Sequence, residues 1–271
     1  MTSFMGCVPV APDAVKVWRG FRRHDLQWRE FLDFLGDTLF PTEGTWRPYF
    51  GLTCYVAGIK SPMASASAPD EFALVFYESQ EVYEEGLRTV AGRIYPLFPG
   101  PNFEPHRGRS AFPKRLQQPF EKNTPYYLFD NRVDWYHGTV RCLLGTATKA
   151  VDRLCASVHE VLATVRQSPP SGLDGLIAMV DENPDRSGYL LCWEHWAEGT
   201  APAAGPLAQL TGLVEVAFHQ DAAEPMKVNG GFYDSNVGLV PALEGDQLLR
   251  LQFLRRRLAV ENGRPVSGPL T

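Results

Sequence analysis

The sequence lacks the patterns that define several large functional classes. No apolar run reaches the roughly 18 residues that a membrane-spanning helix needs, and residues 1–18 have neither the basic start nor the apolar core of a signal peptide. No GxGxxG follows a predicted strand, and neither GxxxxGK[ST] nor GxSxG occurs. These absences predict a cytoplasmic protein without a membrane partner, a nucleotide-binding loop or an α/β-hydrolase nucleophile.

Cysteine is scarce, and its spacing excludes two kinds of metal or cofactor attachment. The five cysteines are far apart, and no CxxC or CxxCH occurs, which argues against a thiolate zinc site and covalent haem. The six histidines never occur at i, i+2 or i, i+4 spacing, so no compact metal site is predicted. Cys54, Cys142 and Cys192 lie in apolar runs, where we expect small buried hydrophobic side chains.

Basic residues are scattered, and the net charge is −5. A chain without a basic stripe has no surface suited to a phosphate backbone, so nucleic acid is not an expected partner. The chain has 271 residues, of which 44% are hydrophobic and 12% aromatic, enough for a substantial core in one large domain or two of ordinary size.

Apolar periodicity predicts the order strand, helix, strand, strand, helix twice along the chain. The first round comprises residues 15–23, 24–40, 51–59, 71–79 and 80–95, closed by a strand within 125–136. The second comprises residues 137–145, 146–167, 173–182, 188–197 and a proline-interrupted helix in 199–212, closed by a strand at 213–220.

Further expectations concern the connecting segments. Seven prolines between residues 96 and 125 argue against a regular element there, so this segment is expected to be an arm or linker. His24 or Asp25 is a candidate cap of the first helix, and Thr146 or Thr148 of the long one. Residues 244–263 form an expected amphipathic helix, and residues 229–238 an expected loop or lid.

Two similar strings, FALVFYES at 72–79 and YLLCWEHW at 189–196, occupy the third-strand position of the two rounds. Setting Tyr77 against Trp193 and Glu78 against Glu194 gives one offset, since 193 − 77 and 194 − 78 both equal 116. Two helices leave one face of each sheet uncovered, so two units can bury these faces against each other. The expected domains are residues 1–130, with the arm at 96–125, and residues 131–271, with a C-terminal helical extension.

The string YLLCWEHWAE at 189–198 resembles the third-strand pattern of the antibiotic biosynthesis monooxygenase-like domains: an aromatic residue, glutamate, a variable residue and tryptophan. Trp193, Glu194, His195 and Trp196 match it, whereas Gln80 stands where the first round would need tryptophan. The element order extends the resemblance over residues 15–220. The implied fold is α+β, with two fused ferredoxin-like (dimeric α+β barrel) units whose antiparallel sheets form a pseudo-symmetric barrel with the helices outside.

The resemblance implies a small-molecule enzyme of secondary metabolism. Its expected reaction is monooxygenation, without a cofactor, of a hydrophobic aromatic or polyketide-like substrate. Cyclisation or isomerisation on the same scaffold, a haem-dependent dehydratase or dismutase, and a non-catalytic ligand-binding protein are the alternatives. A fold shared so widely does not decide the reaction.

Strand alternation puts Tyr189, Leu191, Trp193 and His195 on one face and Leu190, Cys192, Glu194 and Trp196 on the other. His195 is the first candidate base, because burial and a carboxylate partner would tune an imidazole for proton transfer. The alternative is a histidine at a strand end in solvent.

Other candidates lie elsewhere in the chain. His219, at the end of the last strand, was expected on the sheet edge opposite to the strand of His195. Asp134 and His137 form a second catalytic constellation, with a domain-junction role as its alternative. The expected substrate contacts are Trp193, Tyr136, Trp196, Tyr77 and Phe232.

His159 on the long helix is the candidate axial ligand if the protein binds haem; the alternative is a half-exposed helix histidine. No other cofactor and no metal are predicted. Because an internal pair of units would cover the face that single units bury by dimerising, we expect a monomer or loose homodimer that binds a small hydrophobic substrate.

Overall fold

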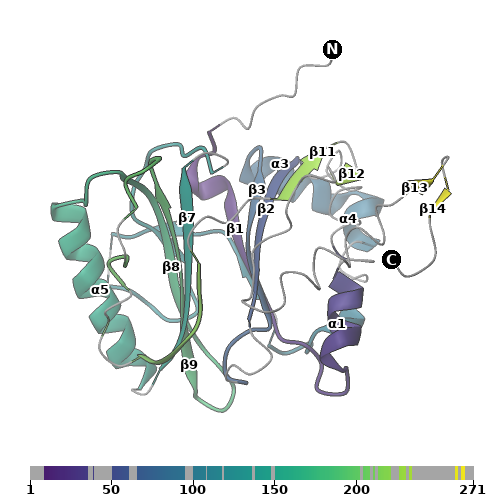
Figure 1. Ribbon diagram of the computed structural model, residues 1–271, viewed down its shortest axis with the longest axis horizontal. Coiled ribbons are helices and arrows are strands. Elements are labelled where there is room, and N and C mark those ends of the chain that lie inside the picture. The colour runs from purple at the N-terminus through teal and green to yellow at the C-terminus, as the bar shows by residue number, and fades with distance from the viewer. Residues whose placement is uncertain are drawn as a thin grey trace.

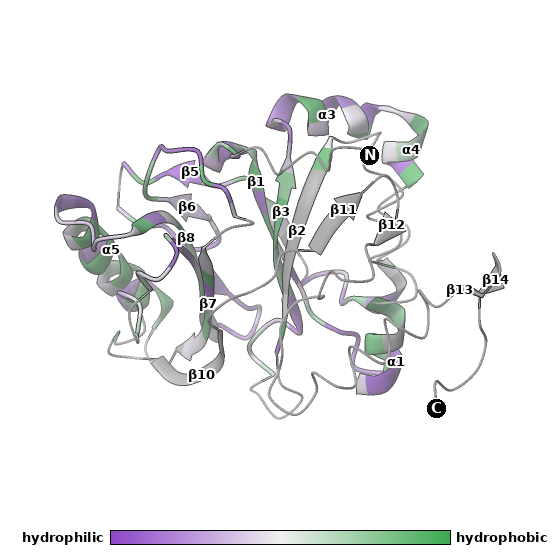
Figure 2. Ribbon diagram, turned by 45° about the horizontal axis from the view of Figure 1, so that its top comes forward, coloured by the Kyte–Doolittle hydropathy of each residue, from purple (hydrophilic) through white to green (hydrophobic). Residues whose placement is uncertain are grey.

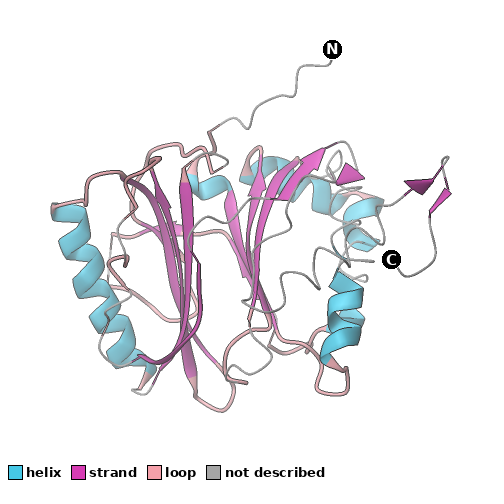
Figure 3. Ribbon diagram, in the orientation of Figure 1, coloured by secondary structure: helices cyan, strands magenta, loops and turns pink. Residues whose placement is uncertain are grey.

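The computed structural model contains two six-stranded sheets with helices on their outer sides (Figures 1 and 3). It describes residues 9–35, 39, 51–60, 66–94, 100–107, 109–117, 119–135, 138–147, 150–201, 204–207, 210, 213–220, 226–229, 232–233, 260–261 and 264–265. The helices are α1 (Trp28–Phe34), α3 (Gln80–Arg88), α4 (Val90–Ile94) and α5 (Val151–Gln167). Short 3₁₀ turns occur at Pro12–Ala14 and Gly100–Asn102.

The first sheet has the strand order β12-β11-β2-β3-β1-β4. Its strands are β1 (Val15–Gly20), β2 (Leu52–Ile59), β3 (Glu71–Tyr77), β4 (Arg109–Ala111), β11 (Met226–Asn229) and β12 (Phe232–Tyr233). The second has the order β10-β7-β9-β8-β6-β5. Its strands are β5 (Lys114–Arg115), β6 (Tyr126–Tyr127), β7 (Thr139–Ala147), β8 (Leu173–Glu182), β9 (Gly188–Trp196) and β10 (Leu213–Gln220).

Four consecutive strands of each sheet, counted from one edge, follow one pattern. In β4-β1-β3-β2 and in β10-β7-β9-β8, the first strand of the round lies between the last and the third. This is the order of a ferredoxin-like unit, as the two rounds of elements predicted. Each sheet is then extended beside its second strand by two short strands, and both extensions come from chain segments outside that round.

The two sheets pack face to face around a shared apolar core. Phe72 of β3 lies 6.3 Å from Trp193 of β9, and Phe76 lies 5.7 Å from Trp135, measured between ring centroids. One cluster of buried side chains contains residues of both sheets, including Val17 from β1. Burying two apolar faces against each other is the solution that two half-covered sheets require. The sheets are separate ladders, so a closed barrel is not shown.

α5 covers the outer face of the second sheet, away from the first sheet (Figure 1). Its buried side chains recur at helical spacing and pack on the residues of β8 and β9 that point outward. They are Val151, Leu154, Val158, Leu162 and Val165. In Figure 2 hydrophobic and hydrophilic residues alternate around this helix, as its amphipathic sequence predicts. Residues 146–150 are not helical where they are described: Thr146 ends up in β7, and the N-cap is Ala150 rather than a threonine.

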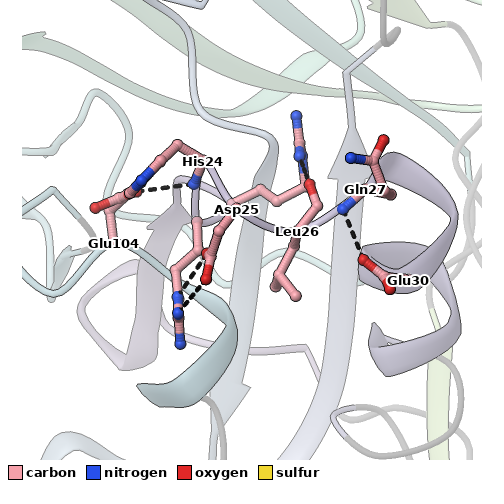
Figure 4. A network of polar contacts seen from close by, with 8 residues as sticks. His24, Asp25, Leu26, Gln27, Glu30 and Glu104 are labelled. Atoms are coloured by element: carbon pink, nitrogen blue, oxygen red, sulfur yellow. Dashed lines mark hydrogen bonds and ion pairs between the residues drawn. The ribbon is translucent and has the colours of Figure 1, made fainter.

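The connection from β1 to α1 is held by a polar network at the surface (Figure 4). The backbone N–H of His24 donates to Oε1 of Glu104 at 3.0 Å, and the N–H of Gln27 donates to Oε2 of Glu30 at 2.8 Å. The helix therefore starts at Trp28 with Gln27 as N-cap, not at His24 or Asp25. The His24 side chain is 91% exposed and therefore lines no buried site. The role of this network is to order the turn between β1 and α1.

Four sequence predictions about secondary structure are wrong. The edge position of the first sheet beside β1 belongs to β4, which lies inside the proline-rich segment, whereas Tyr126–Tyr127 pair with β8 of the second sheet. Asn229 and Phe232–Tyr233, within the segment 229–238 expected to be a loop or lid, lie in strands β11 and β12. Val260–Glu261, expected at the end of a helix, form a strand with Arg264–Pro265; residues 244–259 lie outside the described residues. No helix occurs among the described residues of 199–212.

The expected offset of 116 between the two rounds is also wrong. Phe76 points at the second sheet, whereas its neighbour Tyr77 lies 4.6 Å from Tyr83 of α3, measured between ring centroids. Trp193, by contrast, faces the first sheet. Successive residues of a strand point to opposite faces. An offset of 116 therefore pairs Tyr77, which points outward, with Trp193, which points inward, and the two rounds cannot be equivalent at that offset. The fusion of two repeated domains, with a boundary near residue 130, stays a prediction.

Candidate functional site

His195 lies near the end of β9, on the face that meets the first sheet. It pairs with Val140 of β7 and with Gly175 of β8, so it is in the middle of a three-strand ladder. Tyr189, Leu191 and Trp193 belong to the core between the sheets, and the residues between them belong to the core under α5. The predicted alternation is confirmed. His195 is 4% exposed, so the alternative of a histidine in solvent is wrong.

The carboxylate of Asp174 contacts the imidazole of His195. The Nδ1 atom of His195 lies against Oδ1 of Asp174, the residue preceding its ladder partner Gly175. The Asp174 side chain is 43% exposed, whereas that of His195 is 5% exposed. The pair therefore joins a buried imidazole to a carboxylate that water still solvates. Sequence analysis missed Asp174; the only signal was an acidic residue at the start of the strand next to β9.

The segment leading into β7 covers the His195 ring. The Trp135 ring meets it edge to face at 5.4 Å between centroids. Gly138 has φ +83°, and a Cβ atom there would lie 3.2 Å from Nε2 of His195 and 2.3 Å from the carbonyl oxygen of Trp196. Gly138 allows this close approach because a glycine carries no side chain. Two residues of the string DWYHG, Trp135 and Gly138, thus lie against His195, which was chosen separately as a candidate site.

The remaining predicted residues are distributed over several places. Asp134 is half-buried beside Trp135, whereas Tyr136 and His137 lie outside the described residues. Trp193 shares the inter-sheet face with His195, but Trp196 lies on the other face, where its Nε1 donates to Oε2 of Glu194 at 2.9 Å.

Tyr77, Phe232, His219 and His159 are not assembled with His195 by any described contact. Tyr77 packs against α3, on the outer face of the first sheet. Phe232 is in β12, at the edge of that sheet. His219 is in β10, opposite Leu143; β7 separates β10 from β9, so the expectation of opposite sheet edges is wrong. His159 is half-buried on α5.

A second buried polar cluster lies behind β9, under α5. Arg141 and Glu194 are 1% and 2% exposed, and Arg141 Nη1 lies 3.8 Å from Glu194 Oε2. A Cβ atom at Gly205 would collide with the Glu194 carboxylate at 2.1 Å. The carboxylate is thus closed off by backbone and satisfied by neighbouring donors, which is the arrangement of a structural ion pair.

The cysteine thiols inside the second sheet are held neutral by burial. Burial raises the pKa of Cys142 and of Cys192 well above its usual range, and the Glu194 charge adds to this. The thiols of Cys142, Cys155 and Cys192 are free and buried. They are poor nucleophiles, because the reactive form is the thiolate.

Among the described residues, no group of three or more His, Cys, Asp or Glu side chains is arranged to hold a metal ion. The described helices include none that has the length and apolarity to cross a membrane.

Known proteins offer only distant likenesses. No family model and no curated protein matches the sequence. Three solved structures resemble the fold. A candidate monooxygenase from Lactobacillus acidophilus NCFM has 9% identity and a TM-score of 0.35, covering 76% of this chain and 90% of its own. A candidate monooxygenase from Fusobacterium nucleatum subsp. nucleatum ATCC 25586 has 10% identity and a TM-score of 0.33, covering 85% and 97%. An anthrone oxidase-like protein has 10% identity and a TM-score of 0.35, covering 80% and 94%. Scores this low carry no argument about the reaction.

Proposed function

We propose that this chain is an oxidoreductase of small hydrophobic molecules in which His195 removes a proton from the substrate. The contact between His195 and Asp174 carries the proposal, because a buried imidazole oriented by a carboxylate is the usual arrangement of a general base. The aromatic side chains of Trp135 and Trp193 beside this pair suit an aromatic or polyketide-like substrate.

The carboxylate determines which nitrogen acts. When Nδ1 carries the hydrogen and donates it to Asp174, Nε2 has the lone pair that accepts a proton. The same carboxylate stabilises the imidazolium that forms when the substrate gives up its proton. Asp174 is a positioning residue in this scheme, and His195 is the catalytic residue.

The proposed reaction needs no cofactor, because the deprotonated substrate itself supplies electrons to O₂. A CH₂ group between aromatic rings and opposite a carbonyl, as in an anthrone, becomes a carbonyl. One oxygen atom of O₂ enters the substrate, and the other leaves as water with the two hydrogens of the CH₂ group. The protein contributes orientation, exclusion of water and the base.

The imidazole of His195 is covered, so substrate entry requires movement of its cover. His195 is 4% exposed beneath Trp135 and Gly138. We place the entrance beside Trp135 and Gly138, because neither residue belongs to β7 and both can move without breaking the ladder between β7 and β9.

The decisive experiment measures O₂ uptake and quinone formation with an anthrone, relative to buffer without enzyme. His195→Gln should lower the enzymatic rate by about 10²- to 10⁴-fold. His24→Gln, at a 91% exposed histidine, should leave the rate unchanged. Equal turnover by the His195 variant would remove this residue from the mechanism.

Labelled oxygen separates oxygenation from the other proton-transfer reactions. With ¹⁸O₂, the product of the proposed reaction carries one labelled oxygen atom. Conversion without label, also under nitrogen, would instead show a cyclase or isomerase. Binding without conversion would show a ligand-binding protein, and a Soret band that His159→Ala abolishes would show the haem alternative.

We also propose that the chain is a monomer or a loose homodimer. The two sheets already bury their inner faces against each other, as the contact between Phe72 and Trp193 shows. Light scattering should therefore give the mass of one chain at low concentration. A stable dimer in which the chains share one core would contradict this.

A further inference from the structure

A group of charged side chains lies at the opposite end of the sheets from His195. Asp181 of β8 pairs with Tyr189 of β9, whereas His195 pairs with Gly175 near the other ends of these strands. The six residue-to-residue steps from Tyr189 to His195 span about 20 Å of extended strand. Arg19, near the end of β1, reaches across to Asp181. This cluster is therefore separate from the His195 site.

Arg19 is 1% exposed, and its hydrogen bonding is incomplete. Its Nε donates to Oδ2 of Asp181 at 2.8 Å, and the Tyr189 hydroxyl donates to the same oxygen at 2.7 Å. The Nη1 atom of Arg19 is buried and has no hydrogen-bond partner among the described residues. Burying an unpaired N–H of a charged group is costly, so this position is built to receive an acceptor.

A second arginine, Arg107, lies next to the aromatic pair that Phe21 forms with Tyr189. The guanidinium of Arg107 is 3.8 Å above the ring of Phe21, whose centroid is 5.9 Å from that of Tyr189. Its Nη2 donates to Oδ1 of Asn183 at 3.2 Å, beyond the end of β8. Its Nε is buried and unbonded within the part of the chain that the structure describes. Two arginines thus have N–H groups to offer at this end.

The nearby acids include a third buried carboxylate besides Asp181 and Asp70, because Glu71 is 0% exposed and accepts a hydrogen bond from Nε1 of Trp18 at 2.8 Å. The buried cations are paired one to one, Arg19 with Asp181 and Lys60 with Asp70, the latter at 3.3 Å. Arg107 adds a positive charge to these balanced pairs. Burial lowers the pKa of Lys60; Asp70 opposes this, and the charge of Arg107 lowers it further.

Two more acids lie at the rim, and both are engaged elsewhere. Glu104 accepts hydrogen bonds from the backbone and ring of His24. Asp185 accepts from the backbone N–H of Ser187 at 2.9 Å and from its hydroxyl. These bonds account for the lowered pKa of each carboxyl group, with the Arg107 charge as a smaller contribution. Neither acid has a described bond to Arg19.

We propose that this end of the molecule binds the carboxylate group of a small organic acid, which accepts a hydrogen bond from Nη1 of Arg19. A carboxylate is acceptor-only and matches the planar guanidinium fork. The proposal does not rest on the proposed function, because the two sites are at opposite ends of β9.

The test is a titration of the intact protein with acetate and benzoate at constant ionic strength. The side-chain ¹⁵N–¹H resonances of Arg19 should shift and saturate, and the melting temperature should rise in parallel, since a ligand that binds only the folded state stabilises it. Arg19→Lys keeps the charge toward Asp181 but lacks the fork, and it should weaken binding at least about tenfold. Arg115→Lys, at an exposed arginine, is the matched control.

Three outcomes would overturn the proposal. One is an Arg19 signal that stays unchanged up to high acetate and benzoate concentrations, as expected if water occupies the position. Another is a response to chloride, at the same ionic strength, that equals the response to the carboxylates, or a response of Arg19→Lys to the carboxylates that equals that of the unsubstituted protein. The third is a response to phosphate but to neither carboxylate. The titration of the unsubstituted protein decides even if Arg19→Lys does not fold.

Discussion

The carboxylate of Asp174 lies against Nδ1 of His195, although 21 residues separate them in sequence. The antiparallel register of β8 and β9 brings them together, because it places Gly175 opposite His195. If this contact selects the tautomer of His195, its removal should change the tautomer of the imidazole as well as the rate of the proposed reaction.

Asp174→Asn should lower the rate of anthrone oxidation by roughly 10²-fold, because an amide no longer stabilises the imidazolium. The ¹⁵N chemical shifts of His195 should report loss of the single tautomer protonated at Nδ1, which a merely structural role would not cause. Asp152→Asn, whose side chain is 85% exposed, is the control. An unchanged tautomer and rate would show that Asp174 does not orient the ring.

Gly138→Ala should destabilise the fold by about 2–5 kcal/mol, combining the strain of a left-handed backbone with overpacking. Gly138 has φ +83°, and its new Cβ would lie 2.3 Å from the Trp196 carbonyl oxygen. Gly199 has φ +70° and nothing within 4 Å, so Gly199→Ala should cost only about 1–2 kcal/mol. Urea unfolding measures both, and equal costs would contradict the contact.

Asp181→Ala should cost about 3–5 kcal/mol, because it leaves the buried Arg19 guanidinium without its carboxylate. The matched surface pair joins Arg115 and Asp130, whose side chains are 51% and 53% exposed. Asp130→Ala should change the free energy of unfolding by only about 0–1 kcal/mol. If both substitutions cost the same in denaturant melts, Arg19 and Asp181 do not form a buried pair.

The fold should lose stability as the pH rises from 9 to 11. Burial raises the pKa of Cys155 from 9.0 to about 11, and the charge of Asp152 adds to this. Within this window the unfolded thiol has released its proton and the folded thiol has not, so the folded state loses up to about 3 kcal/mol. Below pH 9 the thiol of Cys155 is protonated in both the folded and the unfolded state, so this loss of stability does not occur.

Cys155→Ala should make the alkaline loss of stability smaller by that amount. Tyr189, whose pKa is raised by burial and by Asp181, remains in the variant and preserves part of the loss. The comparison is between urea midpoints of the two proteins at pH 8 and pH 10.5. Parallel pH dependences would contradict a neutral buried Cys155.

Local periodicity predicted much of the fold. The stripe from Val151 to Val165 specified α5 and its buried face, and the apolar runs specified the long strands. Short elements were missed: β4 has three residues, too few for an alternating pattern, and it lies among prolines that argue against strands. Its place beside β1 depends on the sheet edge that β1 leaves available.

The candidate site, like the fold, could be predicted from the sequence only in part. Alternation along 189–196 correctly put Trp193 and His195 on one buried face. Asp174 escaped notice, because only the register between two strands makes it a neighbour of His195.

The buried apolar residues of α5 and β9, and the faces on which they lie, followed from the order of apolar and polar residues, because side chains alternate in a strand and recur every 3.6 residues in a helix. The burial of the charged residues Arg19 and Asp181 did not follow from it. Which residues meet across strands and sheets was decided by the tertiary structure. Arg19 and Asp181 are 162 residues apart, and their contact depends on how two sheets face each other. Strand register and sheet packing are long-range choices that no local pattern records.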